Sequence, residues 1–231
     1  MLILAIDTAL EACAACVLDT AAGKPVALES LPMPRGHAEA LMPLIARVIK
    51  DAGIGFDRLD RIAVTTGPGS FTGLRVGLSA ARGIALAASK PAVGVTTLSA
   101  YAAPLVSEAS EHPIISAIDA RHDHVYFQVV GGNGNSLIRP RIAPVAEALA
   151  ASRLGAPRLV GNAAKLLAER WPAQALPPVK IEQQPAPDIM WVAWLGAAAN
   201  PNTAPARPYY LRAPDAKPQA GAVARATQAA P

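Results

Sequence analysis

The chain has 231 residues, of which 52% are hydrophobic and 16% charged, and its formal net charge of +4 permits an acidic partner without requiring one. A chain of this size forms one large domain or two small lobes and buries about 70% of its unfolded surface, so it can fold without disulfides or metals. The apolar runs at residues 2–6 and 189–199 are too short to span a bilayer, and the first lacks the basic start of an export signal, which excludes membrane and secreted classes and predicts a cytoplasmic protein.

Three strands are predicted at the amino-terminal end. The apolar run Leu2–Ile6 is typical of a buried strand, and Asp7 and Thr8 follow at its carboxyl end. Cys13–Leu18 and Val26–Leu31 continue as the second and third strands. The chain therefore begins with three consecutive strands before its first helix.

The two cysteines, Cys13 and Cys16, form a lone Cys-x-x-Cys pattern. A zinc site usually needs a second such pair, and a thioredoxin-type pair lies at the start of a helix, whereas these residues lie in a predicted strand. Residues three apart in a strand point to opposite faces of the sheet. We therefore expect two small buried hydrophobic side chains in a reducing compartment.

A helix from about Ala38–Ala52, closed by Gly53, is predicted next. Its apolar stripe, which Met42 widens, consists of Leu41, Leu44, Ile45, Val48 and Ile49. Pro43 is tolerated only in the first turn of a helix, so the regular helix is expected to begin near Met42.

The strongest local pattern is a strand, a glycine-rich turn and a helix. Ile62–Thr66 is a β-branched strand, and Gly67–Gly69, with Pro68 between the two glycines, forces a turn because Gly accepts positive φ and Pro fixes its own φ. Ser70 or Thr72 can cap the helix that follows, which is expected to run from about residue 72 to 89.

That helix has an unusual face of small residues. Gly77 and Gly83 lie in its interior, where each costs about 1 kcal/mol relative to Ala. Residues spaced four apart line one face: Gly73, Gly77, Ala81 and Ala85. Such a face lets another element approach closely, either within the same chain or from a helix of another chain.

Three common phosphate or nucleophile motifs are excluded here by their spacing. A P-loop needs a Lys that this turn lacks, and the Gly after Gly69 is Gly73, one residue too far for a dinucleotide-binding loop. Ser70 follows Gly69 directly, so the Gly-x-Ser-x-Gly pattern of a nucleophile elbow is missing as well.

The second half repeats the element order of the first. The first half ends with a strand at Ala92–Val95 and a helix from Thr97 to about Ser110. The second half has a hairpin turn at Gly131–Gly134. Its predicted elements are a strand from Ile114, strands at Val125–Val130 and Leu137–Ala143, a helix at Val145–Arg153, a strand at Arg158–Val160, a helix at Ala163–Trp171, a strand at Val179–Ile181 and a helix at Asp188–Ala199. The element order strand, strand, strand, helix, strand, helix therefore occurs twice.

Residues Gly67 to Arg75 read GPGSFTGLR, and this stretch resembles the TsaB (YeaZ) family of bacterial tRNA threonylcarbamoyladenosine biosynthesis proteins, relatives of TsaD and the M22-like glycoproteases. The resemblance extends from Leu4 to about Tyr126, with a weaker echo at Pro208–Arg212. It implies an α/β fold of the actin-like type, shared with sugar kinases and heat-shock chaperones, which is a duplicated ribonuclease-H-like fold. The repeated element order supports that fold independently.

The expected organisation has three parts. Residues 1–110 form the first actin-like lobe, which carries the dimerisation helices, and residues 111–212 form a reduced second lobe. From Ala213 onward large apolar residues are almost absent, so residues 213–231 are expected to form a disordered and dispensable Ala/Pro-rich tail.

The resemblance also implies a subunit that is not an enzyme by itself and that serves in threonylcarbamoyladenosine synthesis beside the tRNA anticodon. The implied partners are TsaD, which transfers the carbamoyl group, TsaE, an ATPase, and tRNA reached through the complex, with a homodimer as a further possibility. The implied interface lies on the first-lobe helices at His37, Leu41, Leu44, Ile45, Val48, Phe71, Gly73, Leu74, Gly77, Leu78, Ala81 and Arg82.

A vestigial phosphate site is implied as well. In the superfamily, an Asp at the end of the first strand faces nucleotide phosphate and metal, and Asp7 and Thr8, with Gly67 and Gly69, hold that place here. The alternative is that Asp7 only caps a turn. A Gly-rich turn usually opens the second lobe of the related kinases, but residues 119–121 read Asp-Ala-Arg, so no cofactor is required and a nucleotide is expected only at a complex interface.

No catalytic or metal site is expected. TsaD carries a metal-binding His-x-x-x-His pair where this chain has Thr97 and Tyr101. His122 and His124 share one side of a strand but lack a third ligand, and His37 is expected to start a helix or lie at an interface. The competing classes are an M22-type peptidase, for which no His-Glu-x-x-His or activated Cys is found, and a degenerate sugar or acetate kinase, for which the Gly-rich turn is missing.

Overall fold

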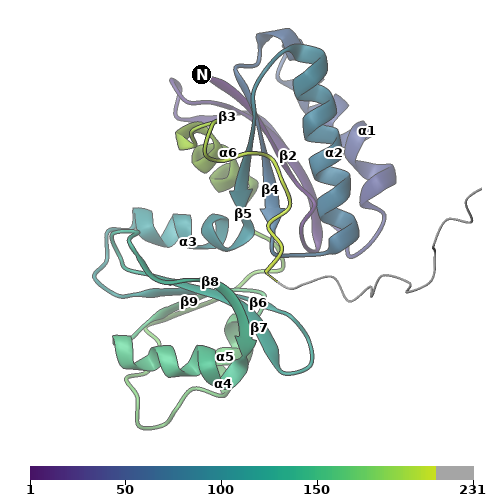
Figure 1. The fold of residues 1–231 in the computed structure, drawn as a ribbon. Helices are drawn as coiled ribbons and strands as arrows, with labels where there is room; N and C mark the ends of the chain where they lie inside the picture. The colour runs from purple at the N-terminus through teal and green to yellow at the C-terminus, as the bar shows by residue number, and fades with distance from the viewer. Residues whose placement is uncertain (212–231) are drawn as a thin grey trace, which may run out of the picture.

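The structure, a computed structural model, describes residues 1–211 and consists of two lobes that lie one above the other (Figure 1). Each lobe is built on a five-stranded sheet. Within residues 1–211, every helix is too short or too polar to cross a membrane. The tail predicted from Ala213, and Arg212 at the end of the Pro208–Arg212 echo, lie outside the described residues.

The elements follow the chain in the predicted order. The first half contains β1 (Leu2–Asp7), β2 (Ala12–Asp19), β3 (Lys24–Pro32), α1 (His37–Asp51), a 3₁₀ turn (Phe56–Arg58), β4 (Arg61–Gly67), α2 (Phe71–Ala88), β5 (Ala92–Thr96) and α3 (Thr97–Ser107). The second half contains β6 (Ile114–Asp119), β7 (His124–Val130), β8 (Ser136–Pro144), α4 (Val145–Leu149), a 3₁₀ turn (Ala150–Leu154), β9 (Arg158–Gly161), α5 (Ala164–Glu169), β10 (Lys180–Gln183) and α6 (Ile189–Ala198).

Both sheets have the same topology. The strand order is β3-β2-β1-β4-β5 in the first and β8-β7-β6-β9-β10 in the second. In each lobe the first three strands pair antiparallel, the fourth pairs in parallel with the first, and the fifth pairs in parallel with the fourth. This internal repeat confirms the predicted duplicated actin-like α/β fold.

The first sheet is buried on both faces. Leu4 and Ile6 of β1 pack beneath α1 and α2, whereas Ile3 and Ala5 face α6 on the other side. This alternation follows from the two-residue period of a strand. Close approach of α6 requires Gly196, because a Cβ atom there would lie 2.3 Å from the Cβ of Ala63.

Two helices lie in a lobe other than the one expected from their place in the sequence. The last helix, α6, covers the first sheet, and α3 covers one face of the second sheet, whose other face is covered by α4 and α5 (Figure 1). A boundary near residue 110 therefore separates the two sheets but not the helices that cover them.

The expectation that Pro43 confines the start of the first helix is wrong. α1 begins at His37 and continues through Pro43. The missing N–H of Pro43 leaves the carbonyl of Glu39 without its helical partner, but both residues are exposed, so water can bind that carbonyl.

The second-lobe helices are shorter than the sequence pattern predicts. The segment predicted as the helix Val145–Arg153 turns from α4 into a 3₁₀ turn after Leu149. α5 ends at Glu169, close to Pro172, which disfavours the helical conformation in the residue before it. The reduction of the second lobe therefore lies in its crossover helices.

Candidate functional site

The carboxyl ends of β1 and β4 meet at a buried carboxylate. The Oδ1 atom of Asp7 accepts hydrogen bonds from Thr65 Oγ1 at 2.6 Å and from the backbone N–H of Ala9 at 2.9 Å. Its Oδ2 atom is buried and has no partner among the described residues. Asp7 therefore caps a turn, as one of the two interpretations predicted, while its place in a vestigial phosphate site stays a prediction.

The glycine-rich loop clamps the segment after β1. A Cβ atom at Gly69 would lie 2.3 Å from the carbonyl oxygen of Ala9, and one at Gly73 would lie 2.1 Å from that of Thr8. Ser70 N donates to Ala9 O at 2.7 Å, and Thr8 Oγ1 donates to Gly73 O at 2.7 Å. The glycines are thus required for close backbone packing within the chain.

Ser70 caps α2, as predicted. Its Oγ accepts from Gly73 N at 3.2 Å, so the helix begins at Phe71, one residue earlier than expected. Gly67 has a φ of 104°, in the region that favours glycine.

A cleft of about 420 Å³ lies between the two lobes, in front of this loop. Its lining includes Glu11 and Ser70 from the first lobe and Asp119, Arg121 and Asn162 from the second. Two carboxylates oppose the single guanidinium, which is unfavourable for the phosphates of a nucleotide. The Thr8 hydroxyl and the Asp7 carboxylate are buried behind the loop and do not line the cleft. The residues present therefore do not fit a nucleotide phosphate.

The turn that opens the second lobe is a strained loop without glycine. Arg121, His122 and Asp123 all adopt the left-handed conformation, with φ values of 63°, 50° and 60°. Asp119 Oδ1 accepts from Arg121 N at 2.8 Å, and Asn162 Oδ1 accepts from Asp119 N at 2.8 Å. The side chains of Asp119 and Asn162 thus bond to backbone N–H groups of this segment. A Gly-rich phosphate turn is absent from the sequence at this place.

The other candidate ligands are structural. Cys13 and Cys16 are buried on opposite faces of the first sheet, as predicted, and burial raises the pKa of their thiols to about 11 and about 12. His124 Nδ1 lies 2.7 Å from the carbonyl oxygen of His122, and His37 Nε2 lies 3.0 Å from that of Leu10. Residues 1–211 contain no group of three or more His, Cys, Asp or Glu that could hold a metal ion.

The residues predicted for a partner interface lie mostly in the core of the first lobe. The structure corrects this prediction for those that are buried between α1, α2 and the sheet: His37, Leu41, Leu44, Ile45, Val48, Gly73, Leu74, Gly77, Leu78 and Ala81. An apolar stripe on a helix marks the face turned to its own sheet, and the four-residue spacing of small residues is part of that face.

Only Phe71 and Arg82 of the predicted interface are exposed. The Phe71 ring lies 6.0 Å from that of Tyr210, and the Arg75 guanidinium lies 3.9 Å from the Phe71 ring. Arg82 Nε donates to Ala206 O at 2.8 Å. The segment after α6 thus packs back onto α2.

The outer side of α2, together with Met42 of α1 and the 3₁₀ turn, forms a different, exposed surface, which we call the outer helical face. It surrounds a hollow of about 580 Å³. Its residues are Met42, Phe56, Asp57, Ala80, Gly83, Ile84, Ala87 and Ala88. The neighbouring Leu86 is 83% exposed. The sequence pattern did not indicate this face, because few of its apolar side chains are large. Two of its residues stand out in the sequence: Met42, which widens the apolar stripe, and Gly83, the second glycine inside the helix.

The buried Asp7 predicts a pH-dependent stability. Burial raises the pKa of its carboxyl above the usual value, although bonds from Thr65 and Ala9 and the charge of His37 oppose this. A carboxyl with a raised folded-state pKa contributes stability that is complete below about pH 4 and is lost as the pH rises through that pKa. Asp7→Asn, which cannot ionise, is therefore expected to gain melting temperature relative to the wild type as the pH rises above about 4. A wild-type advantage that grows with pH would contradict this.

Comparisons with known proteins find a matching family and several similar proteins. The family model described as TsaD, tRNA N6-adenosine threonylcarbamoyltransferase, matches residues 33–192. The chain is 35% identical over 128 residues to the tRNA threonylcarbamoyladenosine biosynthesis protein TsaB of Haemophilus influenzae, which covers 55% of this chain and 53% of that protein. It is 37% identical over 127 residues to the protein of the same description from Escherichia coli, covering 55% and 54%.

The chain thus spans about half the length of these curated relatives. Among solved structures, YeaZ from Pseudomonas aeruginosa is similar, with a TM-score of 0.73 and 26% identity over 91% of this chain and 99% of that one.

Proposed function

Because the chain belongs to the TsaD family of tRNA N6-adenosine threonylcarbamoyltransferases, we propose that it serves in the biosynthesis of threonylcarbamoyladenosine on tRNA. It acts in the cytoplasm as a scaffold subunit that pairs with TsaD and has no catalytic site or required cofactor of its own. TsaE and tRNA are engaged through the resulting complex, and a homodimer uses the same surface when TsaD is absent.

The observation that carries this proposal is the outer helical face. It is exposed, largely apolar and hollowed, and it consists mainly of α2, with Met42 of α1 and the 3₁₀ turn beside it. A Cβ atom at Gly83 would meet no atom within 4 Å, so this glycine is not required by packing within the chain. Small side chains at Ala80, Gly83 and Ala87 let a facing helix approach closely, which suits a helix-to-helix contact with TsaD.

Two further observations support a role without catalysis. Thr97 and Tyr101, at the positions that correspond to the metal-binding pair of TsaD, have no exposed surface, and the Tyr101 hydroxyl donates to Gln184 O at 2.9 Å. Burial raises the pKa of that hydroxyl above its ordinary value, so it does not supply an anionic ligand. The interlobe cleft, with Glu11 and Asp119 in its lining, lacks the cationic surface that a nucleotide needs.

The test is a substitution that changes the outer helical face and leaves the fold intact. Gly83→Leu is expected to weaken association with TsaD by about ten- to a hundredfold, because a bulky side chain separates the two helices at a cost of about 1–3 kcal/mol. The same variant is expected to lower threonylcarbamoyladenosine formation by the reconstituted complex. Affinity is measured by calorimetry against purified TsaD, and modified tRNA by mass spectrometry.

The matched control is Ala198→Leu, which adds the same side chain at an exposed position near the end of α6, on the other side of the first sheet. It is expected to bind TsaD as the wild type does. Equal affinity of the two variants for TsaD would show that the outer helical face is not the docking surface. Hydrolysis of peptides or ATP by the lone chain at enzymatic rates would instead favour the peptidase or kinase class.

A further inference from the structure

Exposed aromatic and arginine side chains form a strip along α2, on the side next to the segment that follows α6. The segment runs beside α2 in the opposite direction, because Arg82 in the second half of α2 contacts Ala206 and Phe71 at its start contacts Tyr210. We call this surface the aromatic–arginine strip. It consists of exposed residues from α2 and from the segment: Phe71, Arg75, Arg82, Arg207, Tyr209 and Tyr210.

The strip occupies a different side of α2 from the outer helical face. Phe71, Arg75 and Arg82 are spaced by four and seven residues, so they lie on one side of the helix. Ala80 and Ala87 of the outer helical face lie on the opposite side. The strip is therefore a separate surface from the one proposed for TsaD.

The strip is cationic, because the two segments that form it carry no acidic residue. Residues 61–107 and 189–214 contain neither Asp nor Glu. Within residues 1–211, no carboxylate forms a salt bridge with Arg75, Arg82 or Arg207. Arg75 and Arg82 are separated by about 10 Å along the helix axis, since each residue adds about 1.5 Å. Cations at this spacing suit a chain of phosphates better than one small anion.

The aromatic side chains of the strip form a fixed group with open ring surface. The Phe71 and Tyr210 rings lie 6.0 Å apart with 31° between their planes, and the Arg75 guanidinium lies 3.9 Å from the centre of the Phe71 ring. Phe71 is 49% exposed and Tyr210 is 47% exposed. Tyr209 N donates to Thr66 O at 2.8 Å, which ties the segment to the first sheet. Unpaired nucleic acid bases stack on exposed rings and guanidinium planes of this kind.

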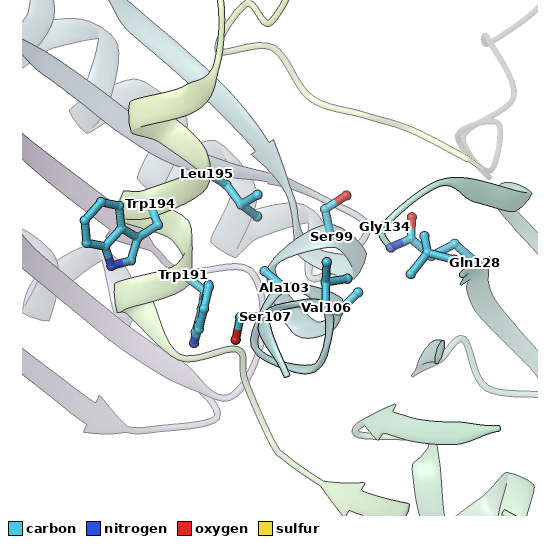
Figure 2. Close-up of a pocket in the computed structure, with 11 residues that line it drawn as sticks. Ser99, Ala103, Val106, Ser107, Gln128, Gly134, Trp191, Trp194 and Leu195 are labelled. Atoms are coloured by element: carbon cyan, nitrogen blue, oxygen red, sulfur yellow. The ribbon is translucent and has the colours of Figure 1, made fainter. Parts of the chain in front are cut away.

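Another group of partly exposed aromatic residues lacks the cations. Trp191 and Trp194 of α6 line a groove of about 380 Å³ along α3 (Figure 2). None of the residues that line this groove carries a charge. Rings alone do not attract phosphates, which dominate the affinity for nucleic acids. The aromatic–arginine strip, by contrast, offers both rings and cations.

We propose that the aromatic–arginine strip binds an unpaired segment of RNA. The guanidiniums of Arg75, Arg82 and Arg207 bind successive backbone phosphates, and unpaired bases stack on Tyr210 and on the Arg75–Phe71 pair. The proposal rests on the proposed function only for the identity of the RNA, which is tRNA. It adds a direct contact by this chain to the engagement of tRNA through the complex.

The binding test uses the full chain and a fluorescein-labelled RNA of about 12 nucleotides, a length within the site sizes of single-strand-binding proteins. Fluorescence anisotropy measures the affinity for oligouridylate, first as a single strand and then paired with oligoadenylate. We expect a Kd of about 1–100 µM for the single strand at about 50 mM salt. The duplex is expected to bind about fivefold more weakly or less, because its bases are not free to stack. Unlabelled oligoglutamate is expected to compete poorly, because it has no rings.

Arg75→Gln tests the phosphate contact. This variant is expected to reduce the slope of log affinity against log salt concentration by about 0.7, the contribution of one phosphate contact in a single strand. The matched control is Arg141→Gln, which removes the same charge and a guanidinium that lies 5.3 Å from the Phe127 ring in the second lobe. The control is expected to keep the wild-type slope and affinity.

Tyr210→Leu tests the stacking contact. Loss of the ring is expected to weaken RNA binding by about five- to a hundredfold, the effect of one stacked base, whereas Tyr210→Phe keeps the ring and is expected to keep the affinity. Both variants are expected to melt close to the wild type, because the side chain is about half exposed. Gly83→Leu, which is expected to bind TsaD weakly, is expected to bind RNA normally, so failure of the RNA site and failure of TsaD docking are distinguishable.

Four results would overturn the proposal. The first is a lack of saturable binding of the single strand at roughly 100 µM chain. The second is equal or tighter binding of the duplex, which would show that unpaired bases are not recognised. The third is competition by oligoglutamate as strong as that by unlabelled RNA, which would identify a contact surface for an acidic protein. The fourth is the same RNA affinity for Arg75→Gln as for Arg141→Gln.

Discussion

Gly77→Leu is expected to destabilise the first lobe severely rather than to weaken a partner contact. A Cβ atom at Gly77 would lie 2.4 Å from Thr8 Oγ1 and 3.6 Å from Val64 Cγ2. Thr8 cannot move away easily, because its hydroxyl is buried and donates to Gly73 O at 2.7 Å. Extra methylenes in a filled core cost about 1–3 kcal/mol of stability. Because the hydrogen bond to Gly73 O holds Thr8 in place, we expect Gly77→Leu to cost at least the upper value of that range. The higher helix propensity of leucine than of glycine offsets only about 1 kcal/mol of this loss.

Gly83→Leu provides the matched comparison for Gly77→Leu, since it makes the same change six residues further along α2. No atom lies within 4 Å of the Cβ position at Gly83, and the residue is exposed. Its free energy of unfolding is expected to equal or exceed that of the wild type by up to about 1 kcal/mol. Urea unfolding of both variants measures the difference. Equal midpoints for the two would mean that Gly77 does not face the end of β1.

Arg158→Ala is the second substitution with a large expected effect. Arg158 is 2% exposed, and its guanidinium donates to Leu105 O at 2.8 Å and to His112 O at 3.3 Å. It thereby ties the end of α3 to β9 of the second sheet. Truncation leaves these carbonyls without a partner and opens a cavity, so the expected loss is about 3 kcal/mol or more.

Arg141→Ala is the control for the loss of one positive charge. The Arg141–Glu147 pair, at 2.8 Å, has both side chains about half exposed. Exposed pairs contribute less than about 1 kcal/mol, so this variant is expected to unfold close to the wild-type midpoint. Similar midpoints for the Arg158 and Arg141 variants would show that the buried guanidinium does not hold the two elements together.

The sequence predicted local structure well wherever neighbouring residues decide it. The turn at Gly67 and the Ser70 cap depend on backbone φ and on one side-chain hydrogen bond, both short-range effects. The opposite orientations of Cys13 and Cys16 follow from the period of a strand. Pro43 and the short α4 were predicted less well, because solvent exposure and tertiary packing, rather than local preference, set those helix lengths.

The candidate sites were harder to predict, because the same pattern serves two purposes. A stripe such as Leu41, Leu44 and Val48 indicates a face that must be covered, but not whether the cover is the chain's own sheet or another protein. The outer helical face joins Met42 of α1, the 3₁₀ turn and α2, and only the tertiary structure brings these segments together.

The order of elements, their duplication and the tight glycine turn were determined by the sequence alone, because hydrophobic period, turn residues and caps act over a few positions. The tertiary structure alone decided that α6 covers the first sheet, that α3 covers the second and that Gly77 faces Thr8 while Gly83 faces outward. Those outcomes depend on contacts between residues far apart in the chain. Such contacts are chosen by how well whole surfaces fit and exclude water, a quantity that no local window of sequence contains.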